Sequence, residues 1–156
     1  MLKLTKRTEY GLIALTHLAK RQGEVVPARE ISEQFPVPKR LLAEVLKDLG
    51  HAGLVESTRG ARGGYALTRS PESISLAEVV SALEGAPQVS GCGDLGMARR
   101  DGECDVQAVC PIRSPLHRLK DRIWSLLDST TLGSIAGGGA TGPLSASAAH
   151  LDPQHR

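Results

Sequence analysis

The chain has 156 residues, which suits about one domain, and its aromatic residues are one Trp, two Tyr and one Phe. Its core must therefore be aliphatic, and a chain of this size gains stability from oligomerisation. The net charge of +2 excludes a broadly basic surface and leaves room only for a focal anion-binding site. No apolar run approaches the roughly 20 residues that cross a bilayer, and no signal core is present, so we expect a cytoplasmic protein without a membrane partner.

The first half of the chain predicts three helices. Apolar residues recur on one helical face between Thr5 and Lys20, and Thr5 is a suitable N-cap. Pro27, expected at position N1, starts a short helix that ends at Phe35–Pro38. The third helix opens at Pro38. Its apolar stripe consists of Leu41, Leu42, Val45, Leu46 and Leu49, and its outer face consists of Lys39, Arg40, Ala43, Glu44, Lys47 and Asp48.

A hairpin and a fourth helix follow. Residues 54–58 and 65–69 alternate as strands do, on either side of the glycine-rich turn Arg59–Gly64. Ser75 and Glu78 form a capping-box pattern for a helix that stops at Gly85.

A further helix is predicted over residues 114–136. Ser114 and Pro115 resemble an N-cap and N1 pair. The seam that follows has coiled-coil spacing and consists of Leu116, Leu119, Ile123 and Leu126. We expect this helix to dimerise. Residues 137–156 are rich in Gly, Ala and Ser, and we expect them to form a disordered tail.

The order of these elements predicts a mainly α fold with a small β-hairpin, a winged helix-turn-helix over residues 1–84. A helix in the major groove needs short or basic outward residues, and a wing needs glycines and arginines near the backbone or minor groove. Either feature alone is also typical of a solvated surface, but the two in this order favour double-stranded DNA as the partner. The predicted contacts are Lys39, Arg40, Ala43, Lys47, Arg59, Arg62, Gly63 and Gly64.

Three segments carry a resemblance to a known family: LTKRTEYGL, VPAREISEQFPVPKRLLAEVLKDLGHAGLVES and RGARGGYALT. They resemble the Rrf family of winged-helix regulators, typified by the iron–sulfur cluster regulator IscR and the nitric-oxide-sensing repressor NsrR. The resemblance implies a homodimeric transcription factor, which we expect to be a repressor, with two recognition helices about 34 Å apart on a roughly palindromic operator. Ala43 stands where some members carry glutamate, so their operator preference does not transfer to this chain.

All three cysteines, Cys92, Cys104 and Cys110, fall in one polar segment, which we assign to a sensor loop over residues 85–113. In a reducing compartment this favours metal or redox chemistry over a structural disulfide. The resemblance implies that the three thiolates hold an iron–sulfur cluster that modulates operator binding. A 2Fe-2S cluster is favoured over 4Fe-4S.

A cluster held by three cysteines needs a fourth ligand. Some family members supply a histidine where this chain has Arg113, which cannot ligate. Others supply a carboxylate from the first helix of the partner subunit, and Glu9 matches that position. The alternative role of Glu9 is that of a first-turn carboxylate stabilised by the helix dipole. The reserve ligands are Asp94, Asp105 and His117.

Other interpretations stay open at this point. A cluster-free regulator could use Cys104 and Cys110 as a redox disulfide. Structural zinc is less favoured, because the closely spaced cysteine pair of zinc sites is missing. A non-DNA-binding dimeric interaction module would leave the arginine-bearing turn unexplained. No nucleophile elbow, phosphate loop or paired-carboxylate pattern stands out, so we expect neither an enzyme nor a small-molecule substrate.

Overall fold

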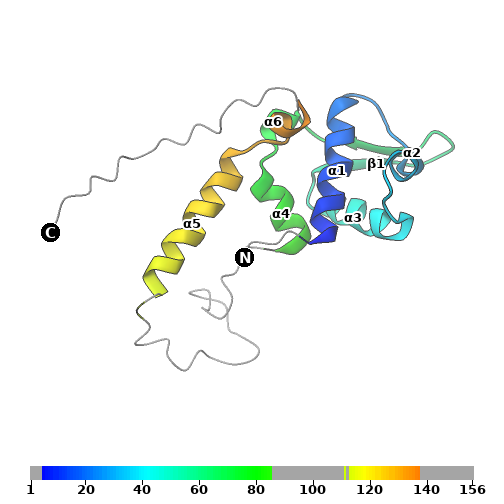
Figure 1. Cartoon of the computed structure of the whole chain (residues 1–156). Helices are drawn as coiled ribbons and strands as arrows, with labels where there is room; N and C mark the ends of the chain where they lie inside the picture. Colours follow the sequence, from blue (N-terminus) through cyan, green and yellow to red (C-terminus); the bar gives the residue numbers. More distant parts are fainter. Residues whose placement is uncertain (1–4, 86–110, 112, 138–156) are drawn as a thin grey trace.

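Figure 1 shows the computed structural model of the chain, which describes residues 5–85, 111 and 113–137. Their elements are α1 (Lys6–Lys20), α2 (Ala28–Gln34), α3 (Lys39–His51), β1 (Val55–Thr58), β2 (Gly64–Leu67), a 3₁₀ turn (Pro71–Ser73), α4 (Leu76–Glu84), α5 (Arg113–Ser129) and α6 (Leu132–Ala136). The predicted mainly helical fold with one small hairpin is confirmed. No helix among these residues is long and apolar enough to span a membrane.

The helix starts follow from local chemistry. The Thr5 side chain accepts a hydrogen bond from the Thr8 amide and caps α1, and Ser75 and Glu78 form the predicted capping box of α4. Pro27 was expected at N1 but occupies the N-cap of α2, and Pro38 occupies the N-cap of α3. Each helix therefore begins one residue after its proline.

The core lies between α1, α3 and α4 and is aliphatic, as the composition requires. The apolar stripe of α3 faces inward, since Leu42, Val45, Leu46 and Leu49 are at most 1% exposed. Leu41, predicted in the same stripe, is only partly buried and packs at the edge of the core. The recognition-helix candidate is thus held by its inner face, which leaves its outer face to solvent.

The hairpin is antiparallel, with Val55 opposite Leu67 and Thr58 opposite Gly64. β1 begins one residue later than the predicted 54–58, and β2 covers 64–67 where 65–69 was predicted, so Gly64 belongs to the strand and not to the turn. A third short segment joins them: Val26 and Tyr65 exchange two backbone hydrogen bonds, of 2.9 and 2.8 Å. The wing is therefore fastened to the connection between α1 and α2.

The single helix expected over 114–136 is instead two helices, broken at Thr130–Thr131. The Leu76 amide donates to the carbonyl of Thr130 (2.8 Å), and the Leu132 amide donates to the carbonyl of Ile74 (2.8 Å). These long-range bonds divert the chain and bury Leu132 completely. The helix also begins at Arg113, so Ser114 lies inside it and is not its cap. In Figure 1, α6 lies near α1 and α5 extends away alongside α4.

Candidate nucleic-acid interface

The outer face of α3 presents the predicted DNA contacts. Lys39, Arg40, Ala43 and Lys47 are all exposed. The Arg40 side chain is 95% exposed, and its Nε lies 3.4 Å from Oε1 of Glu44. An exposed ion pair of this length contributes little stability, so the guanidinium is available to another partner. The structure therefore brings these four predicted residues onto one open surface.

The turn between β1 and β2 carries the other predicted contacts, and Arg59 and Arg62 are exposed there. Gly63 and Gly64 lie where other parts of the backbone come so close that a larger side chain would not fit. A Cβ on Gly63 would lie 2.4 Å from the carbonyl oxygen of Thr58, and a Cβ on Gly64 would lie 2.4 Å from that of Val26. The glycines thus fix the shape of the wing, and the arginines are left as its charged, accessible groups.

The first turn of α1 lies against the end of α4, where the cysteine segment begins. Oε1 of Glu84 accepts hydrogen bonds from the Thr5 amide (3.0 Å), the Thr5 hydroxyl (2.9 Å) and the Thr8 hydroxyl. Partial desolvation acts to raise the pKa of the Glu84 carboxyl, but these hydrogen bonds outweigh it and hold the pKa below its usual value. Sequence reasoning missed this contact, because its partners are 76 and 79 residues apart.

Glu9, the predicted fourth ligand, belongs to the same turn. Its side chain is 43% exposed, and its Oε2 lies 2.5 Å from Nζ of Lys6. The hydrogen bond and the charge of Glu9 raise the pKa of Lys6. The carboxylate is therefore accessible, and its neighbour in the described chain is a surface lysine.

The other predicted ligands are divided between two parts of the chain. Cys92, Cys104, Cys110, Asp94 and Asp105 lie outside the described residues. His117 lies on α5, where its Nε2 is buried and makes no hydrogen bond within the described part of the chain. The described residues contain no group of three or more side chains suited to hold a metal ion.

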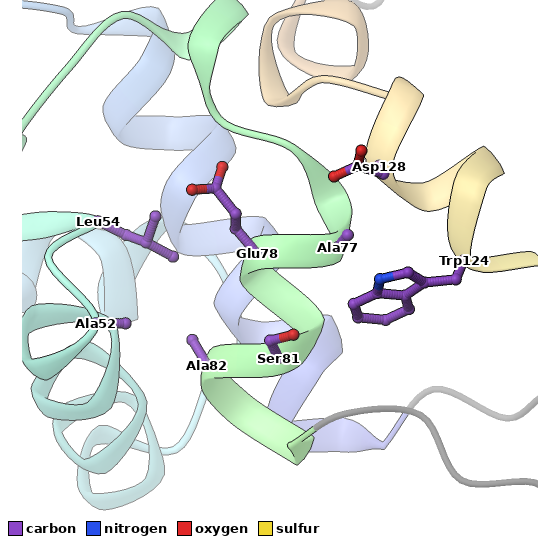
Figure 2. Close-up of a pocket in the computed structure, with 8 residues that line it drawn as sticks. All are labelled: Ala52, Leu54, Ala77, Glu78, Ser81, Ala82, Trp124 and Asp128. Atoms are coloured by element: carbon purple, nitrogen blue, oxygen red, sulfur yellow. The ribbon is translucent and has the colours of Figure 1, made fainter. Parts of the chain in front are cut away.

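A cleft of about 380 Å³ lies between α5 and the neighbouring surface of α4 and the end of α3. Figure 2 shows its lining: Ala52, Leu54, Ala77, Glu78, Ser81, Ala82, Trp124 and Asp128. The indole of Trp124 points from α5 towards Ala77 on α4. The Glu78 carboxylate is bound by Arg69 (2.6 Å), and Asp128 lies 3.5 Å from the Ser75 hydroxyl. This face of α5 contacts α4, whereas Leu119 and Leu126 are each 53% exposed.

A winged helix-turn-helix with basic residues on both its recognition helix and its wing defines a DNA-binding regulator. The sequence model of the Rrf2 family, described as an iron-dependent transcriptional regulator, matches residues 4–138. The chain belongs to this family. It is thus a DNA-binding transcriptional regulator and not an enzyme, as predicted.

Individual relatives agree with this assignment. The HTH-type transcriptional repressor NsrR of Streptomyces coelicolor is 32% identical over 145 residues, which cover 92% of this chain and 93% of the relative. The solved structure of CymR, the global cysteine regulator of B. subtilis, is 30% identical with a TM-score of 0.69, covering 90% of this chain and 100% of that one. T. potens IscR is 28% identical with a TM-score of 0.67, covering 90% and 94%.

Proposed function

We propose that the chain is a homodimeric repressor whose operator binding is modulated by an iron–sulfur cluster. Cys92, Cys104 and Cys110 of one subunit and Glu9 of the partner subunit would hold the cluster. The observation that carries the proposal is the match of residues 4–138 to a family of iron-dependent regulators, in a chain that has its three cysteines between α4 and α5.

DNA reading rests on two exposed groups of residues. Lys39, Arg40 and Lys47 lie on the open face of α3, and we assign them to the major groove of a half-site, where arginine pairs with guanine in a bidentate manner. Ala43 is suited only to apolar contact with a thymine methyl group. Arg59 and Arg62 extend from the wing to the phosphate backbone or the minor groove.

Dimerisation rests on the open side of α5. Leu119 and Leu126 are seven residues apart, one heptad, and both are 53% exposed. Two leucines at this spacing form a seam that a second copy of α5 covers. Two-fold pairing presents two α3 helices to a roughly palindromic operator.

The chemistry of the donor set fits an iron–sulfur cluster. Thiolates are the usual ligands of such clusters, and the exposed Glu9 carboxylate is accessible once Lys6 releases it. When bound, a cluster supplies a redox-active centre whose potential depends on its ligands and its exposure to solvent. Glu9 lies in the turn of α1 that contacts α4, so a subunit-bridging ligand there would make dimer geometry depend on ligation.

A cluster-free thiol switch is the second candidate. The likeness to CymR, the global cysteine regulator of B. subtilis, favours it. In this case Cys104 and Cys110 form a disulfide under oxidant, with the arginines of the same segment promoting the thiolate form.

Anaerobic purification separates the two candidates. The protein is examined by absorption and EPR spectroscopy together with iron and sulfide counts, before and after reconstitution. We expect iron in the wild type, loss of iron on replacing the three cysteines by serine, and weaker iron retention in Glu9→Gln. The matched control is Glu24→Gln, an exposed glutamate beyond the end of α1. Wild-type protein without iron after reconstitution, but with a Cys104–Cys110 disulfide after peroxide, would establish the thiol switch instead.

The DNA assignment is tested by mobility shift on the protein's own promoter. We expect Arg62→Ala to weaken binding on all sequences alike and to reduce the salt slope of the affinity by about 1. Arg118→Ala, which removes an exposed arginine from α5 away from the Leu119–Leu126 seam, is the matched control. Equal salt slopes for the two variants would remove Arg62 from the interface.

A further inference from the structure

The first turn of α1 contacts both the end of α4, which the cysteine segment follows, and the recognition helix α3. Thr5 and Thr8 donate to the carboxylate of Glu84, the last residue of α4. The chain turns away at the next residue, Gly85, whose φ is +80°. A displacement at the α4 end of the cysteine segment therefore acts on Glu84 first.

The same turn is tied to α3. Arg7 lies between the two threonines, and its guanidinium forms an ion pair with Oδ2 of Asp48 in the last turns of α3. The two side chains are 38% and 29% exposed, so solvent screens this pair only partly. The negative charge of Asp48 is unfavourable near the carboxyl end of a helix, and the Arg7 cation offsets it.

Packing around Gly11 makes this connection stiff. A Cβ at Gly11 would lie 2.4 Å from Cδ1 of Leu83 on α4 and 3.4 Å from Cγ1 of Val45 on α3. The side chains of Leu83 and Val45 thus pack directly against the backbone of α1 at Gly11. Close-packed interfaces of this kind shift between discrete arrangements and do not deform gradually.

We propose that Glu84 is a positioning residue that couples the cysteine segment to the recognition helix through the first turn of α1. In the coupled state Glu84 holds Thr5 and Thr8, and Arg7 holds α3 in its DNA-reading position. Release of Glu84 frees the turn, and the Arg7–Asp48 pair transmits its shift to α3. This inference rests on the proposed function, because it requires a cysteine segment with two states.

The test compares operator affinity in two backgrounds, the anaerobically purified iron-loaded protein and the variant with all three cysteines replaced by serine. The ratio of the two affinities measures coupling, and we expect a wild-type ratio within the range of about 5–150-fold typical of allosteric proteins. Glu84→Ala, which removes the acceptor oxygen, and Thr8→Val should each bring the ratio close to one while iron content is retained. Thr8→Ser keeps the hydroxyl and should restore the wild-type ratio.

The controls separate coupling from general damage. Glu78→Ala changes the other glutamate of α4, which binds Arg69 and the Ser75 amide and not α1, and should leave the ratio unchanged. Asp48→Asn should lower the ratio as Glu84→Ala does. A wild-type ratio above one that both Glu84→Ala and Thr8→Val leave intact would overturn the coupling alone. A wild-type ratio of one would overturn the proposed cysteine-dependent regulation and the coupling with it.

Discussion

The winged-helix region and α5 bury their apolar residues to very different extents. In the former, Leu15, Leu46 and Leu49 are 0% exposed. In α5 every residue whose side chain is described is at least partly exposed, and Leu119 and Leu126 are each 53% exposed. The difference teaches that the DNA-reading region completes its core within one chain, whereas α5 leaves leucines uncovered, as the proposed dimer interface requires.

Removing that interface should have the largest effect. We expect the double variant Leu119→Asp/Leu126→Asp to be monomeric and to bind its operator at least about 100-fold more weakly, because the two half-sites are then no longer bound together. Sedimentation and mobility shift measure the two changes. Ser125→Asp places a charge on an exposed position of the same helix and should change neither. A dimeric double variant would show that the seam lies elsewhere.

Matched truncations in the two regions sharpen the contrast. Leu46→Ala opens a cavity in the core and should lower the free energy of unfolding by about 2–5 kcal/mol. Leu126→Ala should instead leave the monomer's unfolding nearly unchanged and weaken association. Denaturant titrations at two protein concentrations distinguish the effects, since only the second depends on concentration. If both variants lost the same free energy of unfolding at both protein concentrations, the division between a core leucine and an interface leucine would be contradicted.

The wing attachment can be loosened without touching DNA-contacting charges. Gly64→Ala pushes a methyl group against the carbonyl of Val26 and should cost about 1–3 kcal/mol of stability. Gly50→Ala is the control, because the nearest atom to its Cβ would be 3.8 Å away. Alanine suits a helix better than glycine, so Gly50→Ala should stabilise by up to about 1 kcal/mol. Thermal unfolding would reveal a wrong assignment if the two variants behaved alike.

The smallest effect is expected at the cleft of Figure 2, between the two regions. The hydrogen bond from Arg69, followed by that from the Ser75 amide, lowers the pKa of Glu78. A carboxyl whose pKa is lowered by folding stabilises the native state above its usual pKa, and this contribution is lost as pH falls through the folded value. Glu78→Gln should therefore lose less free energy of unfolding than the wild type as the pH falls from about 5 to about 3. Urea midpoints measure it, with Glu56→Gln on the exposed face of β1 as the control.

Local signals in the sequence predicted much of the fold. The Thr5 and Ser75 caps, the apolar stripe of α3 and the glycine-rich wing each depend on residues close together in the chain, and all were predicted correctly. The break between α5 and α6 was not, because helical periodicity continues through it while backbone bonds to Ile74 and Leu76 divert the chain.

The candidate site divides in the same way. Exposure of Lys39 and Arg62 follows from the helical period and from the turn residues. The carboxylate–threonine contact of Glu84 and the Arg7–Asp48 pair bring together residues far apart in the sequence. No spacing rule in a single sequence shows such pairs, since only the packing of α1 against α3 and α4 creates them.

The break at Thr130–Thr131 also has a mechanical consequence. Because Leu132 is buried in the core, it fixes the carboxyl end of α5. The opposite end of α5, at Arg113, is the one next to the cysteine segment. Seventeen residues of helix make an arm of about 25 Å. A rotation of about 10° about the carboxyl end would displace the Arg113 end by about 4 Å.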